Sequence, residues 1–149
     1  MKARVLIVDG HSIIFQWPEL AAKHAGNRLA ARESLVKSMT ALQDGSDWHV
    51  VVVFDGRQAR AGEASEPGGI QIFYSANGQT ADSVIERLVA KYSQTYDVTV
   101  ATDDHMERTT VQSFGGRAIS SLQLRDEMEL AGAELAGRIK RLGRESGRR

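Results

Sequence analysis

The sequence lacks cysteine, net charge and any hydrophobic run longer than a strand. Without cysteine, neither a disulfide framework nor a zinc site built on thiolates can form. The apolar runs fall far short of the roughly 20 residues that a transmembrane helix needs. The N-terminus MKARVLIVD leads straight into a strand-like segment and has no signal-peptide pattern, so we expect a cytoplasmic protein.

The 19 basic and 19 acidic side chains cancel, so composition alone does not indicate a nucleic-acid partner. The charges are nevertheless unevenly placed, because the C-terminal stretch RIKRLGRESGRR is basic. A local positive patch can hold a phosphate backbone, although such a stretch can equally be a solvated chain end. We predict one domain over residues 1–143, followed by a basic tail over 144–149.

Hydrophobic runs of strand length alternate with amphipathic segments along the whole chain. This alternation predicts an α/β fold with a mainly parallel sheet and helices on both faces. The glycine-rich stretch GRQARAGEASEPGG, residues 56–69, predicts a loop. Strands are predicted at Arg4–Val8, His49–Phe54, IQIFYS, Val98–Ala101 and RAIS. Helices are predicted after Pro18, over Asn27–Leu42, Ala81–Tyr96 and Asp103–Phe114, and from Ser120 or Ser121 to Leu142.

Acidic residues stand where three of these strands end. Asp9 follows the first strand, Asp55 follows the second, and Asp103 and Asp104 follow VTVAT. A further carboxylate, Asp82, lies in the first turn of a predicted helix. Each acid alone is explained by turn or helix-cap preference. Because the carboxyl ends of parallel strands meet at one edge of the sheet, however, we expect these acids to converge there.

Converging carboxylates repel one another unless a cation lies between them. Hard oxygen ligands without cysteine suit Mg²⁺ or Mn²⁺, which also take ligands from substrate phosphates. In nucleases such ions activate water and stabilise the leaving oxygen of an in-line displacement. The acids therefore favour phosphodiester hydrolysis.

A receiver domain is a rival interpretation, because receivers begin with a strand like VLIVD and phosphorylate an aspartate placed as Asp55 is. A receiver would carry a second acid beside Asp9, where this chain has Gly10. It would also carry a lysine soon after a later strand, and ATDDHMERT has none. Asp82 and Asp104 would then have no role.

Seven sequence blocks in the same order resemble the YacP-like branch of the NYN domains, which are PIN-like and FEN-like ribonucleases. The resemblance spans about Val5 to Glu129 and is most specific between Gly78 and Val89 and at VTVAT–D. The blocks are VLIVDGHSII, WPEL, AARESLV, VVVVFDG, GIQIFYSANGQTADSVIERLV, VTVATDDHMER and GGRAISSLQLRDEME.

The resemblance implies a PIN-like three-layer α/β/α sandwich and a metal-dependent endoribonuclease acting on single-stranded RNA, including mRNA and, in one branch, mRNA on the translating ribosome. The family aspartates fall on Asp9, Asp55, Asp82 and Asp104. On this basis Asp9, Asp82 and Asp104 are expected to bind the metal, Asp55 to be a further ligand or a supporting acid, and Asp103 to be an extra ligand or a helix cap.

The chain departs from the family after the first strand, where relatives read D-G-Y-N and this chain has His11 and Ser12. Serine reaches less far than asparagine, so a second hypothesis is an RNA- or ribosome-binding protein that has lost catalysis. His11 could still stack on a base in place of the family aromatic. Arg32, Arg57, Arg60 and the basic tail are candidates for contacts with the RNA backbone.

Overall fold

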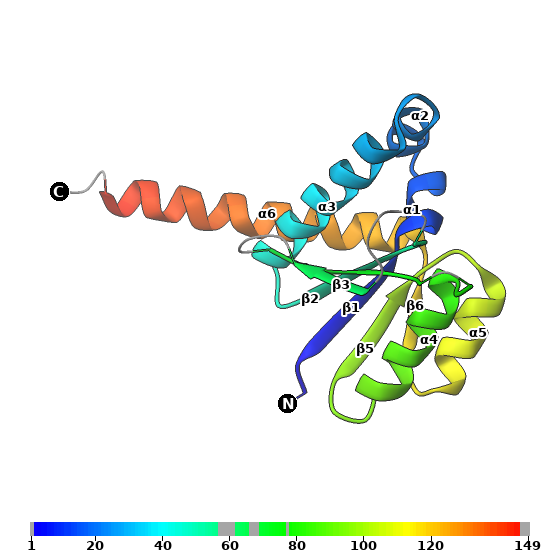
Figure 1. Cartoon of the computed structure of the whole chain (residues 1–149). Helices are drawn as coiled ribbons and strands as arrows, with labels where there is room; N and C mark the ends of the chain where they lie inside the picture. Colours follow the sequence, from blue (N-terminus) through cyan, green and yellow to red (C-terminus); the bar gives the residue numbers. More distant parts are fainter. Residues whose placement is uncertain (1, 57–61, 66–68, 77, 147–149) are drawn as a thin grey trace.

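The computed structural model describes residues 2–56, 62–65, 69–76 and 78–146, whose strands form one central sheet (Figure 1). The strand order is β3-β4-β2-β1-β5-β6. Neighbouring strands pair in parallel except β3, which runs antiparallel to β4 at one edge. The strands are β1 (Arg4–Asp9), β2 (His49–Phe54), β3 (Gly62–Ser65), β4 (Gln71–Tyr74), β5 (Asp97–Ala101) and β6 (Arg117–Ile119).

Helices cover both faces of this sheet and complete the predicted three-layer α/β/α sandwich, which is confirmed. One face carries α1, α3 and α6, with α2 packed on α1 and α3, while the other face carries α4 and α5 (Figure 1). The helices are α1 (Gly10–Gln16), α2 (Pro18–Gly26), α3 (Arg28–Asp44), α4 (Ala81–Tyr92), α5 (His105–Ser113) and α6 (Ser121–Ser146). Among the described helices, none combines the length and the apolar character needed to cross a bilayer.

The central strands are apolar without alternation because both of their faces are buried. Along β1, Leu6 and Val8 enter the core beneath α1, α3 and α6, whereas Ile7 enters the core beneath α4 and α5. The second core is closed by the apolar face of α4, which consists of Ala81, Val84, Ile85, Leu88 and Val89.

The prediction of a loop over residues 56–69 is wrong for Gly62–Ser65, which form β3. Its backbone pairs with β4 from Gly62 opposite Tyr74 to Ser65 opposite Gln71. An edge strand can form from backbone hydrogen bonds to one neighbour, so its composition need not show a hydrophobic pattern. The helix α1, which begins directly at Gly10, was not predicted. The limits of predicted helices also differ: α4 ends at Tyr92 instead of Tyr96, and α6 continues to Ser146 instead of ending at Leu142.

The sheet order places β2, β1 and β5 side by side at its centre. Asp9 pairs with Val53 across β1 and β2, and Val8 pairs with Ala101 across β1 and β5. The residues that follow these three strands therefore emerge at one edge of the sheet. This edge carries the acids predicted to converge.

Candidate metal centre

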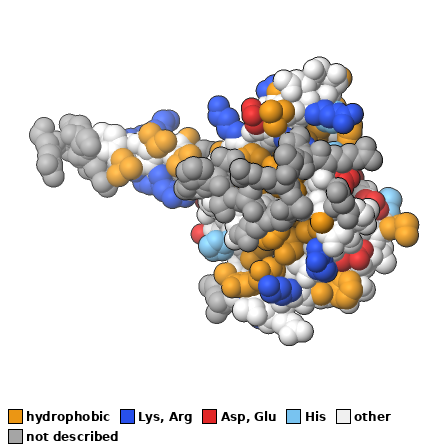
Figure 2. Space-filling view, viewed as in Figure 1, with side chains coloured by type: hydrophobic (Ala, Val, Ile, Leu, Met, Phe, Trp, Pro, Cys, Tyr) orange, Lys and Arg blue, Asp and Glu red, His pale blue; other side chains and the backbone are white. Residues whose placement is uncertain are grey.

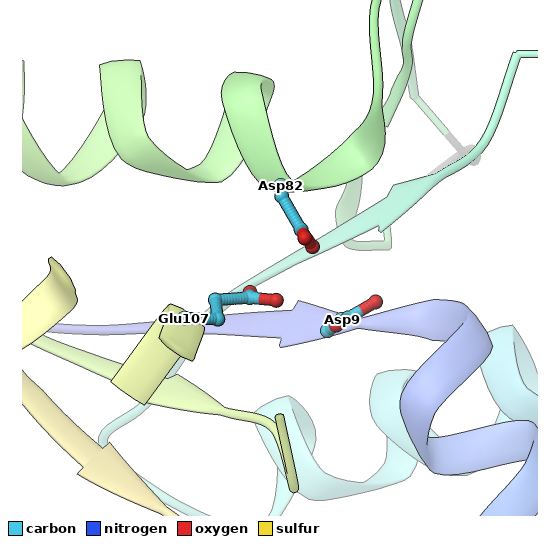
Figure 3. Close-up of side chains that lie close together, drawn as sticks. All are labelled: Asp9, Asp82 and Glu107. Carbon is cyan, nitrogen blue, oxygen red and sulfur yellow. The ribbon is translucent and has the colours of Figure 1, made fainter. Parts of the chain in front are cut away.

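Three carboxylates from three different elements meet at the carboxyl edge of the sheet. Asp9 ends β1, Asp82 lies in the first turn of α4, and Glu107 lies in the first turn of α5. Each offers an oxygen within 4.8 Å of the oxygens of the other two. Figure 3 shows the three side chains pointing toward one another. We call these three residues the acid cluster.

Local hydrogen bonds hold the Asp9 carboxylate and the start of the helix that carries Asp82. The Thr102 hydroxyl donates to Oδ2 of Asp9 at 3.2 Å and so holds that carboxylate against the β5–α5 connection. Asp82 follows Thr80, whose hydroxyl accepts the Ser83 N–H at 3.2 Å and caps α4. Both contacts involve residues next to the strand or helix ends, so the cluster is built on rigid elements.

Glu107 is the member of the acid cluster whose negative charge is least compensated by its surroundings. It is 3% exposed, and neither carboxylate oxygen has a hydrogen-bond partner among the described residues. Burial, followed by contact with the carboxyl groups of Asp82 and Asp9, raises the pKa of Glu107 to about 11. A buried carboxylate without a donor requires either a proton or a cation. The oxygen donor set fits a divalent cation such as Mg²⁺ or Mn²⁺.

Asp9 shares this environment. It is 5% exposed, and burial is the main cause that raises its pKa. The negative charge of Asp82 raises the pKa of Asp9 further, whereas a proton on Glu107, which could then donate to Asp9, and the hydrogen bond from Thr102 both lower it. Two buried carboxylates and a third, more accessible one repel one another when all three are ionised. The cluster therefore favours binding of a cation that neutralises this charge.

Asp104 takes the role of a helix cap. Its Oδ1 accepts the main-chain N–H groups of Met106 at 2.9 Å and Glu107 at 3.2 Å, at the start of α5. Its own N–H donates to the Thr102 hydroxyl at 3.2 Å. Asp104 thus lies beside the acid cluster and orients the helix that carries Glu107.

The Asp103 carboxylate faces α6. It accepts the Ser121 hydroxyl at 2.6 Å and the Ser121 N–H at 2.9 Å, which ties the β5–α5 connection to the start of α6. Asp103 is therefore a structural anchor at the rim of the site.

Asp55 is held at the end of β2. Its Oδ1 accepts the Ser75 hydroxyl at 3.1 Å, and its main-chain carbonyl accepts Nη2 of Arg32 at 3.2 Å. Asp55 and Asp9 line the same cavity at the carboxyl edge of the sheet.

A cavity of about 500 Å³ connects the five predicted aspartates. In Figure 2, acidic side chains gather at the right-hand edge of the molecule, between the upper helices and the α4–α5 layer. The lining residues are Asp9, His11, Ser12, Phe15, Gln16, Asp55, Thr80, Ala81, Asp82, Asp103 and Asp104. The predicted convergence of acids at one edge is thus present.

Ser12 and His11, where the sequence departs from the family pattern, both line this cavity. The Ser12 hydroxyl accepts the Asp103 N–H at 3.0 Å, so it links α1 to the β5–α5 connection. The His11 ring lies nearly parallel to the Phe15 ring, with centroids 6.0 Å apart. Burial, followed by the nearby positive charge of Arg32, lowers the pKa of His11.

The basic residues predicted to contact the RNA backbone do not gather around the acidic cavity. Arg32 is buried against Phe54, with its guanidinium carbon 5.1 Å from the ring centroid, and lines a neighbouring cavity rather than the acidic one. Arg57 and Arg60 lie outside the residues that the structure describes. Residues 138–146 of the basic C-terminal stretch belong to the part of α6 that projects from the domain (Figures 1 and 2), and residues 147–149 lie outside the described part of the chain.

Sequence reasoning missed Glu107. The available signal was its position three residues after Asp104, within the first turn of a helix that starts at the acidic edge. A cap and a residue three positions later both lie at the N-terminal end of a helix. Glu107 could have been found on this basis.

Comparisons with known proteins cover nearly the whole chain. The family model described as "YacP-like NYN domain" matches residues 6–148. "Uncharacterized protein YacP" from Bacillus subtilis (strain 168) is 27% identical over 140 residues, which cover 93% of this chain and 82% of that protein. The crystal structure of Rae1 (YacP) from Bacillus subtilis matches with a TM-score of 0.78 at 26% identity, covering 96% of this chain and 83% of that one. Its W164L mutant gives the same TM-score and identity, with 93% and 82% covered.

Proposed function

The chain belongs to the YacP-like NYN domain family of nuclease domains, and we propose that it is a divalent-metal-dependent endoribonuclease that hydrolyses phosphodiester bonds in single-stranded RNA. The observation that carries this proposal is the acid cluster, in which the Glu107 carboxylate is buried without a hydrogen-bond donor against Asp9 and Asp82. A nuclease cation would supply the missing positive charge.

Asp9, Asp82 and Glu107 would hold Mg²⁺ or Mn²⁺. A bound ion of this kind activates water and stabilises the leaving oxygen. We retain Asp104 in the proposed catalytic and ligand set because it lines the same cavity and its negative charge lies beside the cluster. Asp55 would add further negative charge on the β2 side, and Asp103 would hold the rim in place through Ser121.

The residues around the cluster would keep it ready for the substrate. The Thr102 hydroxyl holds the Asp9 carboxylate, and the Asp104 cap sets the direction of α5 and hence of Glu107. Ser12 would act through its bond to the Asp103 N–H, rather than by the long reach of the asparagine found in relatives. Preorganised groups of this kind spend little energy on rearrangement during the reaction.

The proposed substrate is single-stranded RNA, with mRNA as the natural form and the ribosome as a candidate partner. Support comes from the family resemblance and from the cavity, whose floor is acidic while Arg28 and Arg32 lie within electrostatic range of His11 at its side. Arg32, Arg57 and Arg60 are further candidates for contacts with the RNA backbone.

A second candidate function is RNA or ribosome binding without catalysis. The observation that favours it is the engagement of the Ser12 hydroxyl with the Asp103 N–H, which leaves this side chain committed to a structural contact. Both candidates require RNA binding, so only cleavage separates them.

The test is Mn²⁺-stimulated cleavage of a labelled single-stranded RNA by the whole chain and by Asp82→Asn and Glu107→Gln variants. We expect each variant to lose cleavage by at least about a hundredfold while keeping its fold by circular dichroism. The matched control is Glu134→Gln, which removes one exposed acid from α6 and should cleave normally. Equal cleavage by all four proteins would identify a contaminating nuclease and contradict the proposal. RNA binding without cleavage would favour the second candidate.

A further inference from the structure

An aromatic side chain stands exposed at the rim of the acidic cavity without a role in the core. The Phe15 side chain is 56% exposed, on the short helix α1 that begins directly after Asp9. Burying a phenylalanine in a core contributes roughly 1.5–3 kcal/mol, and an exposed ring forgoes much of this. Its exposure is therefore not explained by packing.

Two histidines frame this ring. His11 precedes Phe15 by one helical turn, and the two rings are inclined by only 15° with their centroids 6.0 Å apart. The His24 ring of α2 meets the Phe15 ring edge-on, with centroids 4.8 Å apart and a 64° angle. The His11 ring is thus stacked with the Phe15 ring, the His24 ring meets Phe15 edge-on, and the Phe15 ring still remains largely exposed.

This surface belongs to the same cavity as the acid cluster. His11 and Phe15 both line the cavity together with Asp9 and Asp82. The exposed Arg28 at the start of α3 lies within electrostatic range of His11, so a polyanion can approach the surface despite the acidic lining of the cavity.

We infer that Phe15, with His11 stacked against it and His24 at its edge, is a stacking platform for a nucleobase of single-stranded RNA next to the scissile phosphate. The inference rests on the proposed function for its substrate class. Exposed aromatic rings bind successive bases of single-stranded nucleic acids, and they do so with little sequence preference because every base has a π face.

Trp17, a second aromatic side chain near the site, is not available for this role. Trp17 is 4% exposed, and its indole N–H donates to the Ser121 carbonyl at 3.2 Å. The Arg125 guanidinium lies over its ring at 4.7 Å and forms an ion pair with Glu19. The Trp17 ring is already covered, so the stacking surface lies on the Phe15 side of the cavity.

The experiment measures binding of RNA rather than its cleavage, so that it does not depend on the proposed activity. The protein is the whole chain carrying Asp82→Asn, in Mn²⁺ buffer, to prevent cleavage. Fluorescence anisotropy compares two labelled octamers, one of adenosine and one of abasic ribose phosphate with the same charge. We expect Phe15→Ala to weaken binding of the adenosine octamer by roughly 5- to 100-fold and binding of the abasic octamer by less than about twofold. Phe15→Trp should restore the preference for bases.

The matched control is Phe114→Ala. It removes a 46% exposed ring at the C-terminal end of α5, whereas Glu107 lies at the N-terminal end, and it should change neither affinity. An equal loss of affinity for both octamers would show that Phe15 only supports the local fold, and would overturn the inference. Unchanged binding in Phe15→Ala, or no binding of adenosine octamers by the parent protein, would also overturn it. If the wild-type chain cleaves no RNA, the proposed function fails, yet a base-dependent effect of Phe15→Ala would still stand.

Discussion

Oδ1 of Asp104 accepts the main-chain N–H of Glu107 at 3.2 Å, so the acid predicted from the sequence positions the acid that the sequence did not reveal. Asp104 caps α5, and this cap directs Glu107 toward Asp9 and Asp82. The two residues therefore act as a unit in which one side chain sets the helix direction and the other completes the cluster.

Substitutions at Asp104 separate its capping role from its charge. Asparagine is also a good N-cap, whereas alanine is not, so we expect Asp104→Ala to lower the free energy of unfolding by about 1 kcal/mol and Asp104→Asn to lower it little. Both variants remove a negative charge beside the cluster, so both should bind Mn²⁺ more weakly. Urea denaturation and calorimetric Mn²⁺ titration measure the two effects. Wild-type Mn²⁺ affinity in Asp104→Asn would mean that Asp104 acts only as a cap.

Glu107→Gln should stabilise the metal-free protein at neutral pH. Because the pKa of Glu107 is raised from 4.5 to about 11, the folded state binds a proton there that the unfolded state has lost at neutral pH. Stability therefore falls as pH rises above the unfolded value, and the glutamine removes this penalty, which is roughly 1–3 kcal/mol.

The check is thermal unfolding in EDTA between pH 5 and 9. The wild-type melting temperature should fall with rising pH more steeply than that of Glu107→Gln, and the Glu134→Gln control should follow the wild type. With saturating Mn²⁺ the order should reverse, because only the wild type gains stability from the bound ion. A parallel fall in both proteins without metal would show that Glu107 titrates normally.

A structural feature can be predicted from the sequence when it depends on a local residue pattern, and it is harder to predict when it depends on contacts between distant segments. The position of Asp9 and Asp82 in the acid cluster could be predicted because Asp9 ends a buried strand and Asp82 opens an amphipathic helix, and both patterns are local. Glu107 could not be assigned with equal ease, because its role arises from the packing of α5 against α4 and β6. The edge strand Gly62–Ser65 was missed for a related reason, since its pairing with β4 depends on backbone rather than side-chain pattern.

Ser12→Ala tests whether Ser12 contributes to catalysis at the position where relatives carry asparagine. The substitution leaves the Asp103 N–H without its acceptor, and losing one partly buried hydrogen bond costs about 1 kcal/mol. If this contact positions the rim, RNA cleavage should slow while Mn²⁺ affinity stays near the wild-type value. The control is Thr109→Ala, which removes an exposed hydroxyl bound to the His105 carbonyl on α5. Equal cleavage rates for the two variants would assign Ser12 no part in catalysis.

Gly10→Ala tests whether the abrupt change from strand to helix after Asp9 is required for the site. A Cβ atom at Gly10 would lie 2.5 Å from the Phe54 ring and 3.0 Å from the Val53 carbonyl oxygen, so either the ring or the start of α1 must move. Overpacking of this kind costs typically about 1–3 kcal/mol. It should also displace Asp9, so Mn²⁺ affinity should fall together with stability.

Gly132→Ala is the matched control, because a Cβ atom there meets no heavy atom within 4 Å. Alanine favours a helix over glycine by up to about 1 kcal/mol, so this variant of α6 should be slightly more stable and bind Mn²⁺ normally. Urea denaturation and Mn²⁺ titration of both variants measure the contrast. Normal Mn²⁺ binding in a destabilised Gly10→Ala protein would mean that the Phe54 ring yields instead of Asp9, and that the acid cluster tolerates a shift at the start of α1.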